Sequence, residues 1–433
     1  MNVSEIRAAL ALGDPAFALA ELRASLDAVE QRGRAELAEW LALLARAGRM
    51  LGGPSFIEAV RGALGDPDDP AALAVLAARL HHEHLPRMAV TLLLRAHRLA
   101  PTDEAILAQL AAALAADGQH ARASTVLRDA PAPGGVSLGR RGAQACHALL
   151  AGNLDEPRAC WPELARSDEP AHRALAAVIG GMLVRADAIA PVAPLDGGDL
   201  RGWHFVITGG FLLRLATHGR GAGMNGRYAF VHDAYADCLA GVRRAARVLA
   251  TIGQPVERVL VIDDRASAIL GRAAAQAIGC PAVAWSLAKR GLVVVYDLAD
   301  LAPALRDALR DHRPGQAVLG HAASWTEEPP FAADLVTRLH QYSRAPWDSH
   351  TGVDPVTGAP CEIAADDADV ATLAARIAGA HVADDEAADL AALLAIAEVS
   401  REIVGDAAGG ALRSAGPRRR AWCGSPVQSL RFR

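Results

Sequence analysis

Apolar positions in residues 1–187 recur at the three- and four-residue spacing of amphipathic helices, and short turns rich in Gly, Asp and Pro separate them. Two adjacent segments, which begin at Pro70 and Glu104, repeat one pattern at an offset of 34. Alanines and leucines coincide at seven positions: Leu73, Leu76, Ala77, Leu80, Ala89, Leu93 and Ala96 match Leu107, Leu110, Ala111, Leu114, Ala123, Leu127 and Ala130. Small residues let antiparallel helices approach closely, and leucines fill the seam between them. The pattern predicts consecutive helical hairpins.

The period of 34, the small-residue positions and the proline at Pro101 resemble the tetratricopeptide repeat. The resemblance implies a solenoid whose first helices line a groove for a protein partner. The Lys/Asn set with which some members bind chaperone tails is absent, so we expect a shallow apolar groove for a helix or for the chain's own C-terminal segment. The groove positions implied by the resemblance are Ala74, Ala78, His81, Ala108, Ala112 and Ala115. A generic helical bundle rich in alanine and leucine is the alternative.

A different pattern follows a linker at 188–201 that is rich in proline and glycine. Residues 203–216 predict a hairpin of two strands, and residues 225–253 predict one long amphipathic helix. Continuous apolar runs at 259–262, 282–285, 292–296 and 317–320 predict strands, and helices are expected at 266–278 and 299–310. Strands without polar alternation, separated by helices, are typical of a parallel sheet that is covered on both faces.

A glycine-rich stretch at 218–227 precedes the long predicted helix and contains G-x-G-x-x-G, with Gly221 as its first glycine. Backbone N–H groups at a helix start suit a phosphate or carboxylate. The candidate anion-binding residues are Arg220, Gly223, Gly226 and Arg227. A dinucleotide site would need an acid about 20 residues after the last glycine. The acid after the next predicted strand, Asp263, is much further from Gly226 than that. A dinucleotide site, an anion-binding loop and a flexible glycine loop remain open.

Two acids, Asp263 and Asp264, stand between a predicted strand and the next helix. The stretch 259–285, which contains these acids, and the stretch 291–309 together resemble the core of a type I phosphoribosyltransferase. The resemblance places Asp263, Asp264 and Ser267 in the pyrophosphate-contacting loop, and Tyr296 and Asp297 where the phosphoribosyl-diphosphate loop begins. The family's Thr-Gly turn is missing from "YDLADLAP", so the resemblance implies that the fold is retained without transferase activity. The alternative is that the two acids only end a strand and cap a helix.

Three other groupings of reactive side chains have simpler explanations. "HHEH" at residues 81–84 contains metal-ligand types, but it also fits a solvated helix end. Asp233 and Asp237 lie four apart, as an acid–base pair or a solvated helix face would. His321, Ser324 and Asp334 are the residue types of a catalytic triad, but no G-x-S-x-G elbow accompanies them. We therefore expect no metal, no cofactor and no catalytic residues.

Composition limits the partners. The formal net charge is −5, so no overall field attracts nucleic acid or an anionic membrane. No acid follows Asp406, but six arginines do, so the tail could remain solvated or dock on an acidic groove or anionic partner, nucleic acid included. The six cysteines form no C-x-x-C pair and suit a reducing cytoplasm, and no apolar run is long enough to span a membrane.

The sequence thus predicts a multidomain α + α/β protein. Residues 1–187 are an antiparallel helical-hairpin solenoid, 188–201 a linker, and 202–345 a parallel-sheet α/β domain. Residues 346–366 are a connector, 367–406 C-terminal helices and 407–433 a basic tail. The expected function is a cytoplasmic scaffold that binds a protein partner through the repeats. The alternative is a ligand-binding or transferase-type enzyme that acts on a phosphorylated sugar or nucleotide at the α/β domain.

Overall fold

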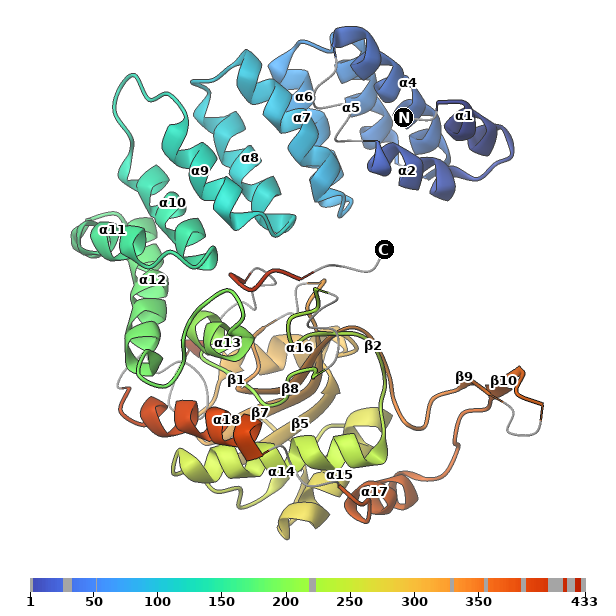
Figure 1. Ribbon diagram of the computed structural model, residues 1–433, viewed down its shortest axis with the longest axis vertical. Helices are drawn as coiled ribbons and strands as arrows, with labels where there is room; N and C mark the ends of the chain where they lie inside the picture. Colours follow the sequence, from blue (N-terminus) through green and yellow to red (C-terminus); the bar gives the residue numbers. More distant parts are fainter. Residues whose placement is uncertain are drawn as a thin grey trace. The chain divides into compact units, whose positions relative to one another are not determined.

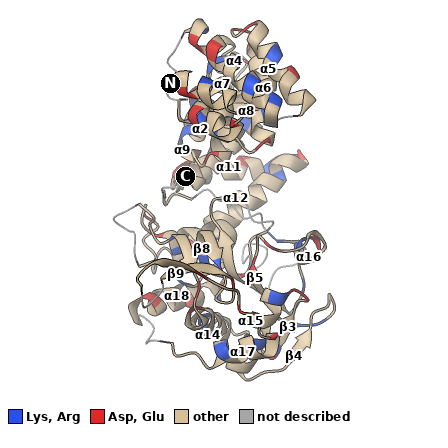
Figure 2. Ribbon diagram, turned by 90° about the vertical axis from the view of Figure 1, so that its right-hand side faces the viewer, with Lys and Arg blue, Asp and Glu red and all other residues tan. Residues whose placement is uncertain are grey.

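A computed structural model describes residues 3–25, 33–51, 53–217, 223–327, 331–353, 357–382, 387–403, 416–418 and 425–429. The chain divides into two compact units, Met1–Leu175 and Ala176–Arg433 (Figure 1). The first consists of helices packed in pairs, and the second contains a parallel sheet with helices that follow it. The predicted fold class is confirmed. Basic and acidic residues are interspersed along both units (Figure 2), in keeping with the small net charge of −5.

Consecutive helices of the first unit pack against each other along its whole described length. They are α1 (Val3–Ala11), α2 (Pro15–Ala24), α4 (Arg34–Leu51), α5 (Pro54–Gly65), α6 (Pro70–His82), α7 (Pro86–Leu99), α8 (Glu104–Ala116), α9 (His120–Asp129), α10 (Leu138–Leu150) and α11 (Asp155–Arg166). Helix α12 (Pro170–Ile189) begins in the first unit and ends in the second.

The helix starts repeat with the period found in the sequence. Helices α6, α8 and α10 begin at residues 70, 104 and 138, which are 34 apart. The residue before each start caps the helix: Asp69, Asp103 and Ser137 each accept a hydrogen bond from a backbone N–H of the first turn. Such a side chain satisfies one of the N–H groups that a helix leaves without a partner. Capping residues therefore fix the same helix boundary three times.

The turn inside each hairpin repeats as well. His84, Gly118 and Gly152 have φ of 57°, 76° and 93°, and their spacing equals that of the helix starts. This left-handed conformation favours glycine, which explains two of the three residues and makes His84 the exception. All fourteen alanine and leucine positions that match between the two segments are buried, none more than 8 % exposed. The prediction of consecutive, similarly built hairpins is confirmed.

The main sheet of the second unit is entirely parallel. Its strands are β1 (Phe211–Leu212), β2 (Tyr228–His232), β3 (Val259–Val261), β4 (Ala282–Ala284), β5 (Gly291–Asp297), β7 (Gln316–Ser324) and β8 (Leu335–Arg344). The order is β1-β8-β7-β5-β3-β4. Strand β1 pairs with the start of β8 and β2 with its end, so these two short strands share one edge position. Every residue of β7 is buried, as expected for a central strand.

The helices of the second unit pack on the sheet or on one another. They are α13 (Leu200–Thr208), α14 (Tyr235–Thr251), α15 (Arg265–Ile278), α16 (Pro303–Leu309), α17 (Val370–Ala378) and α18 (Ala387–Ser400). Helices α14 and α15 pack on one face, and Figure 1 shows α13 and α16 on the other. A Cβ added at Gly241 of α14 would lie 2.6 Å from the Thr337 side chain and 3.1 Å from His321 Nδ1. Glycine there lets α14 approach β7 and β8 closely.

Two small sheets complete the second unit. Strands β9 (His350–Val353) and β10 (Pro360–Ile363) form an antiparallel hairpin that projects from the α/β body in Figure 1. Strand β6 (Asp311–His312) pairs with β11 (Gly416–Pro417) from the C-terminal segment. The tail thus contributes a short strand to the second unit.

The strand hairpin predicted at 203–216 is wrong. Residues 200–208 form helix α13, and only Phe211 and Leu212 form a strand. Gly209, with φ 77°, ends the helix in the left-handed conformation. A Cβ at Gly210 would lie 2.4 Å from the Ala333 carbonyl oxygen, so the second glycine serves close backbone packing.

The long helix predicted at 225–253 is wrong in its first part. Residues 228–232 form β2, and α14 begins only at Tyr235. Strand β2 forms because it pairs with the end of β8, a strand that the pattern of apolar residues does not predict. The apolar residues at 228–232 are compatible with a helix or a strand, and pairing with a strand that is distant in the sequence decides for the strand.

Candidate functional site

The sheet reverses its winding between β3 and β5. From β3 the chain continues through α15 to β4 on one side, and from β5 it continues through α16 to β7 on the other. The connections that leave the carboxyl ends of these neighbouring strands therefore diverge. In open α/β sheets, ligands bind in the crevice at such a switch point.

Three of the sequence candidates meet at this switch point. Asp264 caps α15, with its carboxylate accepting from the Ser267 backbone N–H at 2.9 Å. The buried Ser267 hydroxyl accepts from the Tyr296 N–H at 3.0 Å, which ties the start of α15 to the end of β5. Asp263 is exposed beside them. The helix-capping role proposed as the alternative for Asp264 is thus present in the structure.

More carboxylates gather beside β5. Asp297, the last residue of β5, has its Oδ2 atom 2.9 Å from Nε2 of His340. The pKa of Asp300 is raised by partial burial, by the negative charge of Asp297 and, more weakly, by that of Asp264. Neighbouring carboxylates repel each other when both are ionised, and a bound cation or hydroxyl donor would reduce that repulsion.

A buried polar cluster lies behind Tyr296, centred on the carboxylate of Asp233 directly after β2. The Tyr296 hydroxyl donates to Asp233 Oδ2 at 3.0 Å, and His321 Nε2 lies 2.8 Å from the same oxygen. The Cys238 thiol donates to it at 3.2 Å. The Arg338 guanidinium binds both carboxylate oxygens, with Nη1–Oδ1 at 2.7 Å and Nη2–Oδ2 at 2.6 Å. We call these five residues the Asp233 cluster.

Electrostatics fix the protonation states in the cluster. Burial alone would raise the pKa of Asp233, but the charges and hydrogen bonds of His321 and Arg338 outweigh it and hold that pKa well below its usual range. Burial, and then the Asp233 charge, raise the pKa of Tyr296 and of Cys238. Burial lowers the pKa of His321. An ionised Asp233 is thus surrounded by the Arg338 cation, by the imidazole of His321 and by the neutral Tyr296 hydroxyl and Cys238 thiol.

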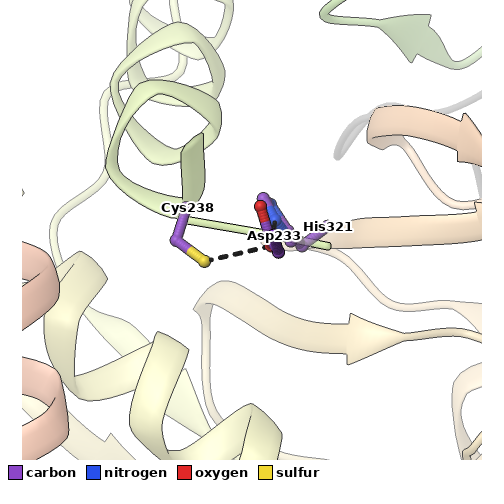
Figure 3. A group of neighbouring side chains, drawn as sticks. All are labelled: Asp233, Cys238 and His321. Carbon is purple, nitrogen blue, oxygen red and sulfur yellow. Dashed lines mark hydrogen bonds and ion pairs between the residues drawn. The ribbon is translucent and has the colours of Figure 1, made fainter. Parts of the chain in front are cut away.

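Asp233, Cys238 and His321 each offer one metal-ligand atom, and these atoms lie within 4.8 Å of one another (Figure 3). The surroundings do not fit a metal ion. Arg338 already contacts both carboxylate oxygens and supplies the compensating charge, and the raised pKa of Cys238 disfavours the thiolate that a metal requires. The raised pKa of Cys238 also disfavours the thiolate of a Cys–His nucleophile pair, and the Cys238 thiol donates to Asp233. The Asp233 cluster is an internal hydrogen-bonding hub.

The glycine-rich loop is placed differently from the prediction. Arg220 lies outside the described residues. Gly221 lies outside them as well. In the described part of the loop, Gly223, Asn225 and Gly226 have left-handed conformations, with φ of 77°, 47° and 92°. Arg227 is 4 % exposed and stacks over the Trp325 ring at 5.4 Å. Strand β2 follows the loop, so the helix start that was expected to supply backbone N–H groups is absent here.

The implied groove positions of the first unit differ in accessibility. Ala74 is buried, at 6 % exposure, and belongs to the interior. The exposed or half-buried positions are Ala78, His81, Ala108, Ala112 and Ala115. Val75 on the same helix as Ala78 is 57 % exposed. The exposed residues of α6 and α8 thus include Val75 and several alanines, with Arg79, His81 and Gln109 exposed on the same helices.

Sequence reasoning missed the Asp233 cluster. His321 and Asp334 are residue types of a catalytic triad, but the structure pairs His321 with Asp233, and Asp334 forms an ion pair with Arg418. A signal was available: His321 and Arg338 interrupt apolar strands, "VLGHAAS" and "LVTRLH". A polar residue inside a buried strand needs a buried partner, although the sequence does not identify it.

No protein-family model, curated protein or solved structure matches this chain. The helical hairpins and the parallel sheet agree with the two resemblances in shape alone. Within the described parts of the chain, no helix is both long and apolar enough to cross a bilayer.

Proposed function

We propose that the helical unit binds a protein partner through the exposed face of α6 and α8, in the manner of a tetratricopeptide-type scaffold. One observation carries this proposal: helix starts, capping residues and left-handed turns all recur with one common period. A hairpin repeated with a fixed period stacks into an extended surface, and such surfaces bind peptides and helices.

The chemistry of the surface indicates the kind of partner. One stripe of outward residues on the first helices is small or apolar and follows a helical spacing: Ala71, Val75 and Ala78 on α6, and Ala105, Ala108 and Ala112 on α8. The second helix α9 instead exposes Ala121, Thr125 and Arg128. A shallow apolar surface without bulky side chains suits the apolar face of an amphipathic helix.

Charge placed on this surface tests the proposal. Ala78→Glu and Ala112→Glu in the full chain each put a carboxylate on the proposed face, and Ala121→Glu makes the same change on α9 as the matched control. Glutamate and alanine both favour helix, so circular dichroism and thermal midpoints should remain close to those of the unchanged chain. We expect the two face variants to lose a partner that the control retains. Equal recovery of that partner by all three would refute the proposal.

We propose a second, independent role for the α/β unit, binding of a phosphorylated sugar or nucleotide at the β3–β5 switch point. The meeting of Asp263, Asp264 and Ser267 with the end of β5 supports it. The acids would hold ribose hydroxyls or a divalent cation.

Thermal shifts with Mg²⁺, nucleotides and phosphoribosyl diphosphate test this second role, because a ligand at 100 times its Kd stabilises by about 2.7 kcal/mol. Asp263→Asn, after the carboxyl end of β3, should abolish the shift, whereas Glu257→Gln, before the amino end of β3, should leave it unchanged. A flat response to the whole panel contradicts the role.

A further inference from the structure

Two histidines meet where the second helix of one hairpin packs against the first helix of the next. His120 is the first residue of α9, and His147 lies in the last turn of α10. Their Nδ1 atoms are 3.2 Å apart, and their rings stack with centroids 5.4 Å apart and planes inclined by 23°. At that distance one ring donates from Nδ1 and the other accepts, so two imidazole nitrogens face each other inside the helical unit.

The repeat does not itself require these two side chains. One repeat period earlier, the same places are taken by Pro86 at the start of α7 and by Ala113 of α8, which pack together in the same way. Ala113 is fully buried, so an apolar residue is sufficient for this helix contact. Burying an imidazole costs desolvation that alanine avoids. The histidine pair therefore needs an explanation other than packing.

The two nitrogens have the spacing of ligands on one metal ion. A tetrahedral zinc ion with Zn–N bonds of about 2.0–2.1 Å holds its ligand nitrogens about 3.3–3.4 Å apart. The two Nδ1 atoms, at 3.2 Å, are close to that separation. Burial lowers the pKa of His120 to about 3 and that of His147 to about 4. Both imidazoles are thus neutral at pH 7, which is the form that binds metals.

The donor atoms select the kind of ion. Imidazole nitrogen suits Zn²⁺, Ni²⁺ and Cu²⁺, whereas Mg²⁺ and Ca²⁺ take oxygen ligands. Among the residues that the structure describes, groups of three metal-ligand side chains occur only at Asp233, Cys238 and His321, so no third His, Cys, Asp or Glu joins this pair. Further coordination positions therefore remain for water or for a ligand from outside the chain.

We propose that His120 and His147 form a two-histidine site for a divalent transition-metal ion such as Zn²⁺, bound by both Nδ1 atoms. The ring that carries its proton on Nδ1 moves it to Nε2, so that both lone pairs face the ion. Because the two ligands come from consecutive hairpins, the ion links α9 to α10 and stabilises the helical unit. This site is independent of the repeat surface and of the β3–β5 switch point.

Hydrogen exchange of the full chain, freed of metal by a chelator, tests the site without any substitution. Zn²⁺ should slow exchange at residues 120–129 of α9 and 138–150 of α10, and Mg²⁺ at the same concentration should not. Zn²⁺ protection confined to other parts of the chain, such as the exposed histidines at 81, 82 and 84, would overturn the proposal.

Calorimetry with Zn²⁺ assigns the two ligands, in a chain whose exposed histidines at 81, 82 and 84 are replaced by alanine. His147→Ala introduces the residue found at Ala113 one period earlier, so we expect it to fold, as circular dichroism would show. His147→Ala and His120→Gln each remove one ligand and should weaken Zn²⁺ binding at least ten-fold. His97→Ala, at a half-buried histidine of α7, is the matched control and should not change the affinity. Unchanged Zn²⁺ affinity in both ligand variants would refute the site.

Discussion

Replacing Asp233 by asparagine removes the charge at the centre of the Asp233 cluster while keeping the size of the side chain. The carboxylate is fully buried and meets four side-chain donors, of which Arg338 binds both oxygens. The asparagine amide would leave the Arg338 cation without its counter-charge. It would also turn an NH₂ group toward side chains that now donate to the carboxylate.

The magnitude follows from that arrangement. Removing one partner of a buried ion pair costs about 3–5 kcal/mol, because the remaining charge stays buried without compensation. The hydrogen bonds from Tyr296 and His321 would also lose a charged acceptor, for which about 1.5–3 kcal/mol each is typical, against about 0.5–1.5 kcal/mol for a neutral one. These contributions overlap, so we expect Asp233→Asn to destabilise the α/β unit by about 3–5 kcal/mol.

A matched control lies four residues further along. Asp237 also pairs with an arginine, Arg214, at 2.6 Å, but the two side chains are 40 % and 29 % exposed. Asp237→Asn should therefore cost about 0–1 kcal/mol. Because the chain has two units, a single unfolding midpoint would mix them, so the assay is native-state hydrogen exchange of the slowest β7 amides. Equal protection of these amides in the two variants would refute the assignment of Asp233 as a buried, ionised hub.

Three further predictions concern packing, turns and pH. Gly118→Ala should destabilise the helical unit by about 1 kcal/mol, whereas His84→Gly, at the equivalent left-handed turn, should not destabilise it, as urea titrations would show. Gly241→Ala should cost about 1–3 kcal/mol by forcing α14 away from β7 and β8, measured by exchange at those strands. The pKa values of His120 and His147 are lowered by burial, to about 3 and about 4. Their unfolded forms bind protons first, so the helical unit should lose stability as the pH falls from about 6.5 toward 4, and replacing both by glutamine should flatten that loss.

The helical unit was predictable because its signals are local. Asp103 caps a helix, Gly118 turns the chain and Leu107 is buried, all within one hairpin. Each feature depends on neighbours in the sequence, and the fixed period of the repeat makes one hairpin evidence for the next.

The errors in the α/β unit have the opposite cause. Strand β2 forms through pairing with β8, so Tyr228 lies beside His340 in the sheet although the helical pattern of the surrounding residues is equally good. Period alone does not decide between helix and strand when the deciding partner is distant in sequence. The strands 259–261 and 291–297 were identified because their continuous Val and Leu content marks a buried parallel sheet without reference to a partner.

The candidate site divides in the same way. Asp264 and Ser267 stand in one strand–loop–helix segment, so their position at the sheet edge followed from the sequence. The Asp233 cluster joins Asp233 to His321 and Arg338, which are 88 and 105 residues away. Only the order of the strands brings these side chains together, and that order was not available from the pattern of apolar residues.

Hydrogen exchange of the full chain, alone and with a captured partner, tests the central claim most directly. We expect added protection in α6 and α8, at residues 71–82 and 105–116, and little change in α9 or in the α/β unit. Protection confined to the α/β unit, or spread evenly over α9 and α8, would contradict binding through the repeated first helices.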